Sequence, residues 1–505
     1  MKAWRWPILA LVVALLVAAT VIERGEADTE SVAPAAVAAV PTASRPGALG
    51  STWFCAAGTA VGDDTGEAEQ IVHLANASAD TVQGRVTVYP SEAETVSTDV
   101  SLVPLARVDL RVSDIVRAPF ASVLVELDGG EVAVQHELVG PSGRSLSACA
   151  SAPAASWYFP QATTRAGAKL LLTLFNPFPT DAVVDVNLEA EDGARTPQAF
   201  QGLVVPGGRA TTIDVGEVVT LRQELATAVN VRSGRVVAEQ VQIVTEAEGP
   251  PPSLAAMLGA PRAEPVWLFP DGIGADAYEE RFILYNPSDF DAEVDLEVLL
   301  DDPETNGVAE PFEVAVQPRR YAIVDVFADG RVPVGVAHAA VVRSRNDVPV
   351  VAQRVVVGQE GSAQRGLSYT LGSPVVAARW LAPVASVAGA SGAASIVYNP
   401  SPTEPVVLSA RMLGAGRYDT IEGLDGATLA PLGRIVIDIG PDGLGYDRPA
   451  VEIEAQGPVV VETRFGFEEG TDLSYLIAVP VVGTVEVPTA LVGELSQQTV
   501  VLGGE

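Results

Sequence analysis

Residues 157–160 read WYFP and residues 170–177 read LLLTLFNP, and these two phrases decide the fold because they recur along the chain. The same opening phrase starts at four tryptophans, which are spaced by 104, 110 and 113 residues: Trp53, Trp157, Trp267 and Trp380. Nineteen residues after the last three lies an Asn-Pro pair, at Asn176, Asn286 and Asn399, whereas the first copy has Asn76 followed by Ala77. A period of about 110 residues with markers in constant order indicates four tandem repeats.

The segments around these markers have the alternation of β-strands. Val184, Val186 and Leu188 alternate with polar residues, so one face of this segment is apolar and the other is polar. Each repeat holds about seven such short runs and lacks an amphipathic helical stretch. We therefore expect an all-β protein of four tandem β-sandwich repeats. Each repeat should resemble an immunoglobulin domain in the number and spacing of its strands.

The chain begins with an export segment. Lys2 and Arg5 precede an apolar run over residues 6–22, which is just long enough to span a membrane. Val17, Ala18 and Ala19 also form an acceptable cleavage site, so an uncleaved anchor and a cleaved signal peptide both remain open. Either alternative carries the remainder out of the cytoplasm.

The expected domain organisation follows from these features. Residues 1–22 form the signal anchor, and residues 23–50, rich in alanine and proline, form a disordered linker. The sandwich repeats occupy residues 51–155, 156–265, 266–378 and 379–494, and residues 495–505 form a tail. The junctions between repeats are only a few residues long, so we expect neighbouring repeats to touch and form a semi-rigid rod.

The repeated side chains are expected to be structural. The four tryptophans suit the core or the contacts between repeats better than an exposed platform for a sugar ring. The asparagines Asn76, Asn176, Asn286 and Asn399 are expected to end strands and set turns.

Two further sets of polar residues recur. An arginine follows a proline in each repeat, and a Gln or Glu lies within a buried-looking strand; the two sets are Arg107, Arg209, Arg320 and Arg434, and Gln135, Glu239, Gln353 and Glu462. We expect ion pairs within each repeat, such as Glu239 with Arg209 and Glu462 with Arg434.

The two cysteines, Cys55 and Cys149, lie at the start and end of the first repeat. Because they follow an export segment, we expect a disulfide between them.

Composition excludes several classes of function. A net charge of −33 argues against nucleic acid and anionic lipid surfaces as partners. The three histidines, His73, His136 and His338, lack metal-ligand spacing, and no nucleophile or phosphate-loop motif is present, so we expect no catalytic residues, cofactor or metal site. The acidic turn that starts at Asp438 could ligate calcium, but a solvated turn is the favoured interpretation.

The order Trp-aromatic-x-Pro, Asn-Pro, Pro-x-x-Arg and a PVVAE-like strand resembles an uncharacterised family of actinobacterial envelope proteins, a domain of unknown function with an N-terminal anchor and tandem repeats. The resemblance covers nearly all of the chain after Gly50. It implies an extracellular location and a repeat architecture but no activity. Asn76-Ala77 and the missing aromatic residue two places after Trp380 depart from the pattern.

These observations predict a non-catalytic structural or interaction protein of the bacterial cell envelope. The N-terminal helix would hold it on the membrane, or it would be secreted if the segment is cleaved, and its partner would be cell-wall glycan or another envelope protein. The alternative is a carbohydrate or small-molecule binding module, with the first repeat as the candidate. An enzyme that uses a carboxylate pair is the least favoured hypothesis.

Overall fold

The computed structural model describes residues 39–62, 66–245, 251–272, 274–301, 309–328, 330–387, 389–414, 416–440, 443–467 and 472–488. Within these ranges the chain is built from antiparallel β-sheets, which confirms the all-β prediction, and the only helical segments are 3-10 turns of three residues. No helix in the described ranges is long and apolar enough to span a membrane. The predicted anchor, the linker up to residue 38 and the predicted tail lie outside the described residues.

Unit 1 contains two four-stranded sheets, ordered β1-β6-β3-β4 and β5-β2-β7-β8. Its strands are β1 (Ser51–Cys55), β2 (Glu69–Asn76), β3 (Val82–Pro90), β4 (Val96–Leu102), β5 (Ala106–Arg111), β6 (Ala121–Leu127), β7 (Val132–Gly140) and β8 (Gly143–Ala148). An immunoglobulin domain instead joins its first strand to its second. Here β1 pairs with β6, so the strand order differs from the immunoglobulin-like order that we expected.

Units 2 and 3 repeat this arrangement. Unit 2 has sheets β12-β11-β15-β9 and β14-β10-β16-β17, with β13 on β11; unit 3 has sheets β18-β23-β20-β21 and β22-β19-β24-β25. The strands of unit 2 are β9 (Ser156–Phe159), β10 (Ala168–Asn176), β11 (Ala182–Ala190), β12 (Gly193–Arg195), β13 (Leu203–Val205), β14 (Arg209–Asp214), β15 (Leu225–Ser233), β16 (Val237–Val244) and β17 (Ser253–Leu258). Those of unit 3 are β18 (Val266–Gly272), β19 (Tyr278–Tyr285), β20 (Ala292–Leu300), β21 (Phe312–Val316), β22 (Tyr321–Asp325), β23 (His338–Ser344), β24 (Val351–Gly358) and β25 (Gly366–Leu371).

Unit 4 departs from the others because one long strand, β32 (Ala450–Phe467), takes part in both of its sheets. This strand occupies the place of two successive strands in the other units, such as β6 and β7. The remaining strands are β26 (Val376–Ala382), β27 (Ala390–Tyr398), β28 (Val406–Gly414), β29 (Arg417–Thr420), β30 (Ala427–Leu429), β31 (Arg434–Asp438), β33 (Leu473–Ile477), β34 (Val479–Pro480) and β35 (Val485–Glu486).

The four repeat tryptophans are buried in the cores of their units, with side chains at most 2% exposed. In units 2, 3 and 4 the indole Nε1 donates a hydrogen bond to a backbone carbonyl 79 to 83 residues further along the chain, at 2.8 to 3.0 Å. Each of these tryptophans thus fills the core of its unit and provides a backbone carbonyl with a hydrogen-bond donor. In unit 1 the Trp53 Nε1 has no such acceptor among the described residues.

The repeated asparagines connect two loops in every unit. Asn286, for example, donates from Nδ2 to the carbonyls of Phe290 and Val316 at 2.7 and 2.9 Å, and its Oδ1 accepts from the Ser288 backbone N–H at 3.0 Å. Asn76, Asn176 and Asn399 make the corresponding bonds. All four are buried. Because the side chain bonds its own loop and the loop after the next strand or strands, it ties both turns to the strand that it ends.

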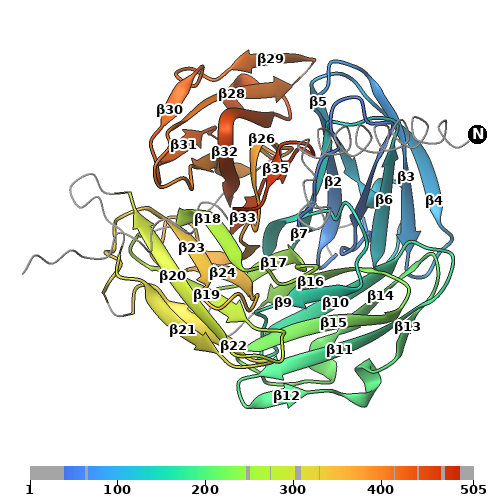
Figure 1. The fold of residues 1–505 in the computed structure, drawn as a ribbon. Helices are drawn as coiled ribbons and strands as arrows, with labels where there is room; N and C mark the ends of the chain where they lie inside the picture. Colours follow the sequence, from blue (N-terminus) through green and yellow to red (C-terminus); the bar gives the residue numbers. More distant parts are fainter. Residues whose placement is uncertain are drawn as a thin grey trace, which may run out of the picture.

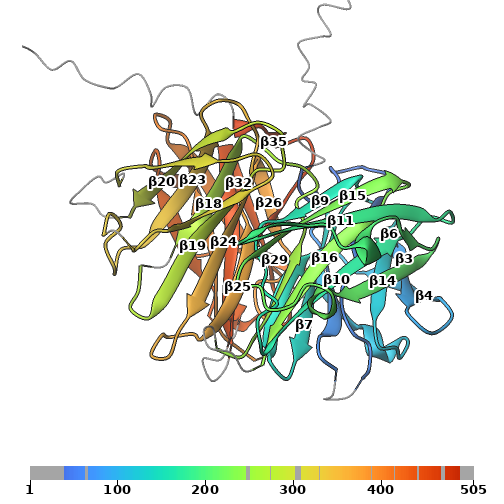
Figure 2. The same ribbon diagram turned by 90° about the horizontal axis from the view of Figure 1, so that it is seen from below.

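The four units close into a ring rather than the rod that we expected. Figure 1 shows them arranged around a common centre, and in the perpendicular view of Figure 2 units 3 and 4 lie on one side and units 1 and 2 on the other. One edge strand of each unit lies at this centre, where β8 contacts β17, β17 contacts β25, β25 contacts β33, and β33 contacts β8. We call β8, β17, β25 and β33 the axial strands.

The axial strands are joined by side-chain hydroxyls. Each is an edge strand, whose free N–H groups require partners when they are buried. The Ser145 hydroxyl of β8 accepts from the Ala256 N–H of β17, Ser368 of β25 accepts from Tyr475 N–H of β33, and Ser474 of β33 accepts from Leu146 N–H of β8, at 3.0 to 3.1 Å. The corresponding place in β17 is Ala255, which has no hydroxyl. Three of the four unit pairs are therefore connected by the same bond.

Part of the predicted linker belongs to the folded body. Ala43 forms a parallel β-bridge to Val481 of unit 4, with bonds Ala43 N–H to Pro480 O at 3.0 Å and Val482 N–H to Ala43 O at 2.8 Å. The Ser44 carbonyl accepts from the Glu131 N–H of unit 1 at 2.9 Å. The expectation of a disordered linker through residue 50 is therefore wrong for residues 39–50, because this segment finds backbone partners on both units that meet where the ring closes.

The predicted disulfide is confirmed: Cys55 of β1 is bonded to Cys149, with an S–S distance of 2.00 Å. It joins residues 94 apart in sequence. Closing a loop of that length stabilises a fold by about 4–5 kcal/mol in the chain-entropy model.

The ring predicts a compact particle in solution. For a fragment that starts shortly before Ala39, we expect a radius of gyration of about 22 Å by small-angle X-ray scattering, as for a compact body of some 450 residues. Four units in a row would give roughly twice that value and an elongated distance distribution, and such a result would contradict the ring.

The buried asparagine predicts a specific loss of stability. Asn286→Ala removes the side-chain amide that bonds two buried loops, so the carbonyls of Phe290 and Val316 and the Ser288 N–H lose their partner. The free energy of unfolding of this region should fall by about 2–4 kcal/mol. Chemical denaturation followed by tryptophan fluorescence measures this change. Ser288→Ala, which removes only the neighbouring hydroxyl, serves as the control and should cost less than half as much; equal losses would argue against the role assigned to the amide.

Candidate functional site

The contacts between units are the places where the repeated polar residues gather. The four arginines that follow a proline all reach the preceding unit of the ring. Arg209 donates to Ala93 O of unit 1 at 2.9 Å, Arg320 pairs with Glu189 of unit 2, and Arg434 pairs with Asp271 of unit 3. Arg107 of unit 1 completes the ring by donating to Ser386 O and Pro449 O of unit 4 at 2.9 and 3.0 Å.

In units 2, 3 and 4 the repeated Gln or Glu also reaches the preceding unit, where it accepts a backbone hydrogen bond. Glu239 Oε2 accepts from Ala57 N–H at 2.9 Å, Gln353 Oε1 from Gln161 N–H at 3.0 Å, and Glu462 Oε2 from Asp271 N–H at 3.0 Å. Each donor lies four residues after the tryptophan of its unit. The sequence marked both ends of this bond, but it did not show that they belong to different units.

The ion pairs expected within repeats are instead formed between units. Glu239 pairs with His136 of unit 1 at 2.7 Å and not with Arg209; Glu462 pairs with Arg354 of unit 3 at 2.6 Å and not with Arg434. Each Glu and the arginine of its own repeat both reach the preceding unit, and Glu462 and Arg434 even contact the same residue there: Glu462 accepts from the Asp271 N–H, and Arg434 pairs with the Asp271 carboxylate. The expectation failed because period and spacing cannot distinguish a contact within a repeat from one between repeats.

The side chain that follows the repeated Gln or Glu alternates around the ring between one that pairs with an acid of the next unit and one that does not. The residue that follows the repeated Gln or Glu is His136, Gln240, Arg354 and Thr463 in units 1 to 4. His136 and Arg354 therefore form buried acid–base pairs with the next unit, whereas Gln240 bonds the Gln161 carbonyl within its own unit at 2.8 Å.

The contact between units 3 and 4 carries the largest buried polar cluster among those described. Glu280 lies 3.1 Å from His338 Nε2 and 3.8 Å from Arg354 Nε, and all three side chains are at most 1% exposed. The Arg354 guanidinium lies 4.6 Å from the centre of the Tyr475 ring. Asp271, also buried, pairs with Arg434 and, at 2.7 Å, with Arg464. The cluster thus contains three carboxyl groups and three guanidinium groups.

Burial raises the pKa of Glu462 in this cluster to about 7, although the charge of Arg354 opposes the shift. Elsewhere burial lowers the pKa of His73, but hydrogen bonds to Asp109 and Glu137 outweigh it and leave that pKa raised. These carboxylates lie at 2.7 and 3.5 Å from the imidazole. The three histidines thus lie in three separate clusters, each beside a carboxylate.

A cleft of about 510 Å³ opens beside the cluster between units 3 and 4. Its lining includes Tyr278 and Gln364 of unit 3 and Ser391, Asp438 and Arg464 of unit 4. Five glycines also line it: Gly272, Gly274, Gly335, Gly392 and Gly466. This size is typical of small-molecule sites, which occur preferentially between domains.

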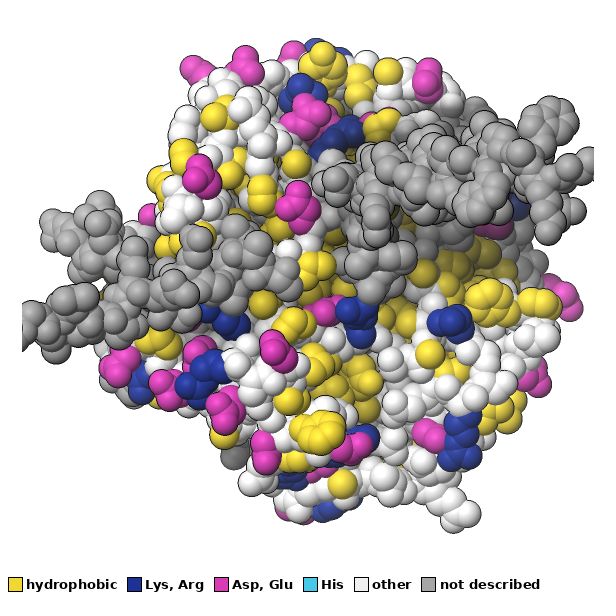
Figure 3. Space-filling view, in the orientation of Figure 1, with side chains coloured by type: hydrophobic (Ala, Val, Ile, Leu, Met, Phe, Trp, Pro, Cys, Tyr) yellow, Lys and Arg dark blue, Asp and Glu magenta, His cyan; other side chains and the backbone are white. Residues whose placement is uncertain are grey.

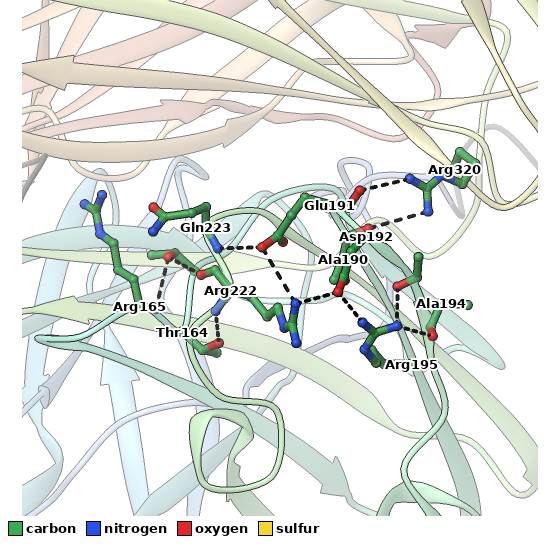
Figure 4. Close-up of polar contacts among 12 residues, drawn as sticks. Thr164, Arg165, Ala190, Glu191, Asp192, Ala194, Arg195, Arg222, Gln223 and Arg320 are labelled. Atoms are coloured by element: carbon green, nitrogen blue, oxygen red, sulfur yellow. Dashed lines mark hydrogen bonds and ion pairs between the residues drawn. The ribbon is translucent and has the colours of Figure 1, made fainter.

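A second polar site is the arginine cluster where unit 3 meets unit 2. Figure 4 shows Arg320 directed to the turn that ends β11, with Arg195 and Arg222 around Asp192 of the same turn. Arg222 and Arg195 lie 2.9 and 2.6 Å from Asp192. These arginines are already paired with carboxylates. We therefore interpret the cluster as one that stabilises the contact between units 2 and 3 and the turn after β11.

The structure does not place the expected candidates in one site. The four tryptophans are too deeply buried to stack on a ligand, and the four asparagines bond to loops of their own units. No group of three His, Cys, Asp or Glu side chains suited to a metal ion occurs in the described ranges. Asp438 accepts from Gly440 N–H at 3.1 Å, while Asp442 lies outside the described residues. The cleft lies between units 3 and 4, not in the first repeat. Its glycines do not recur at the repeat period, so the sequence did not mark them as a site.

The raised pKa of Glu462 predicts a pH-dependent stability. Between pH 4.5 and about 7 the folded protein retains a proton that the unfolded chain has released, so raising the pH through this window favours unfolding. We expect the melting temperature of the wild type to fall across this range relative to that of Glu462→Gln. The variant is less stable at every pH because Arg354 loses its charged partner. The quantity to compare is therefore the slope of the melting temperature against pH.

Glu454→Gln, an exposed position on the same strand, is the matched control and should follow the wild-type slope. If the melting temperatures of the wild type and Glu462→Gln had the same slope against pH, the raised pKa assigned to Glu462 would be contradicted.

Comparison with known proteins gives a family without an assigned activity. A search of curated proteins returns no match. Among solved structures, Thermotoga maritima 1070 aligns over 22% of this chain and 94% of its own at 21% identity and a TM-score of 0.19, and the Anabaena sensory rhodopsin transducer over 18% and 83% at 24% identity and a TM-score of 0.16. A tetra-tandem repeat from the extending region of a large adhesion protein aligns over 85% of this chain and 99% of its own at 11% identity and a TM-score of 0.11.

These scores are too low to support an argument about the chain. The family model described as "Family of unknown function (DUF5719)" matches residues 130–420, more than half of the 505 residues. The chain therefore belongs to the DUF5719 family.

Proposed function

We propose that this protein is a non-catalytic structural or interaction protein of an actinobacterial cell envelope, in which four copies of one β-sandwich repeat form a closed ring outside the membrane. The observation that carries the proposal is the use of the repeated polar residues: the arginines and the Gln or Glu series join one unit to the next. Repetition therefore serves to build one rigid body. A rigid body on an exported chain suits presentation of a fixed surface to an envelope partner.

The export segment and the cysteines support the location. The apolar run over residues 6–22 follows positive residues, and the Cys55–Cys149 disulfide is typical of an oxidising compartment. The protein would be single-pass with its C-terminal part extracellular, or secreted if the segment is cleaved. Cell-wall glycan and another envelope protein are the proposed partners.

The surface also suits this role. On the face shown in Figure 3, acidic and basic side chains are interspersed and no extended patch of one sign appears. Interspersed charge with a net charge of −33 favours solubility and disfavours nucleic acid. The second candidate function, a carbohydrate or small-molecule binding module, is favoured by the cleft between units 3 and 4.

Cell fractionation tests the location. When the full chain is expressed in a bacterial host with one membrane, we expect it in the membrane fraction, degraded by protease added to intact spheroplasts, with both cysteines protected from alkylation until a reductant is added. Replacing Leu11 and Leu15 with arginine should retain the protein in the cytoplasm with alkylatable cysteines. A wild-type chain that is cytosolic and resistant to external protease would overturn the proposal.

A further inference from the structure

We infer that the cleft between units 3 and 4 is a binding site for a neutral saccharide. The inference goes beyond the proposed scaffold role. It concerns an activity of the purified protein, so its outcome is independent of where the protein resides.

The cleft combines size with a wall that permits close approach. Its volume of about 510 Å³ is within the range of about 300–1,000 Å³ for small-ligand sites. A Cβ at Gly272 would overlap the His338 ring, so this glycine lets the wall lie directly over the buried cluster. Gly392 differs, because a Cβ there would meet nothing within 4 Å. The backbone at Gly392 therefore faces open space.

The polar groups of the cleft match hydroxyl groups. The Gln364 amide and the Ser391 hydroxyl are hydrogen-bonded to each other at 2.8 Å, and Ser391 donates to Phe467 O at 2.9 Å. Together with the Asp438 carboxylate and the Arg464 guanidinium, they place both donors and acceptors at the cleft. Asp438 and Ser391 are exposed, and the Arg464 side chain is 34% exposed. A saccharide hydroxyl both donates and accepts, so it can bond to either kind of group.

The aromatic side chain at the edge is fixed in place. The Tyr278 hydroxyl accepts from the Gln364 N–H at 2.9 Å, which connects the ring to another lining residue of the same unit. Tyr278 is only partly buried. A partly exposed ring beside planar polar groups suits the apolar face of a sugar ring.

Charge decides against an ionic ligand. The lining contains one cation, Arg464, and one exposed anion, Asp438, and the guanidinium of Arg464 is already paired with Asp271 at 2.7 Å. An anionic ligand would meet Asp438, and a cationic one would meet Arg464, so a neutral polyhydroxylated ligand is the best match.

Binding is tested with the full-length chain in lauryldimethylamine oxide, a detergent without a sugar headgroup. The probes are maltotriose, mannotriose and tri-N-acetylchitotriose as neutral trisaccharides, and trigalacturonate as the anionic one, each titrated by saturation-transfer NMR. We expect at least one neutral trisaccharide to bind and trigalacturonate to bind at least tenfold more weakly.

Two variants locate the site. Gly392→Leu places a side chain in open space at the cleft and should raise Kd at least tenfold, whereas Thr428→Leu, an exposed position of β30 in the same unit, should leave Kd unchanged. Asp438→Asn keeps an acceptor for the Gly440 N–H, so the turn is retained, and should weaken binding severalfold through the loss of charge-assisted bonds.

Each outcome bears on the inference. Binding that Gly392→Leu abolishes and Thr428→Leu retains would support it. Absence of binding by all three neutral probes, equal affinity in wild type and Gly392→Leu, or preference for trigalacturonate would overturn it.

Discussion

The structure depends on one hydrogen bond that is repeated at three of the four contacts between units: a buried backbone N–H, four residues after the tryptophan, bonds to a Gln or Glu side chain of the next unit. A buried donor without a partner costs about 1–3 kcal/mol. A unit separated from its neighbour would leave this donor exposed together with the edge of its axial strand. Units 1, 2 and 3 therefore each depend on the next unit for the partner of this N–H, and a ring lets every unit have a neighbour on both sides.

Closure at the contact between units 4 and 1 uses further means. Arg107 reaches two carbonyls of unit 4, Arg379 of unit 4 pairs with Glu131 of unit 1 at 2.6 Å, and Ala43 adds a strand to Val481. The other three contacts join units that are consecutive in the chain. This contact joins the two ends of the described body, and the additional backbone bonds of residues 43–44 supply what a covalent connection supplies elsewhere.

The alternation at the position after the repeated Gln or Glu gives the ring an order. His136–Glu239 and Arg354–Glu462 occupy equivalent places in alternate contacts, and a misplaced unit would bury one member of such a pair without its partner. The contact between units 3 and 4 has the most buried charged groups, because three acids and three arginines lie beneath a cleft lined by glycines. There the fourfold pattern is broken by an opening, which is why the cleft is the part of the ring that we assign to ligand binding.

The sequence by itself determined the all-β class, the four-part repetition, the disulfide and the positions that recur, because period, alternation and cysteine placement are properties of the chain. Asn286 and Trp267 could be recognised as recurring markers for the same reason. Only the tertiary structure decided that the units form a ring, that Glu462 meets Arg354 instead of Arg434, and that Gly392 and Asp438 border one cleft with Tyr278. The physical reason is that identical repeats offer identical partners within and between units. Which partner is used depends on the orientation of one unit relative to the next, and that orientation is set by packing across the contact.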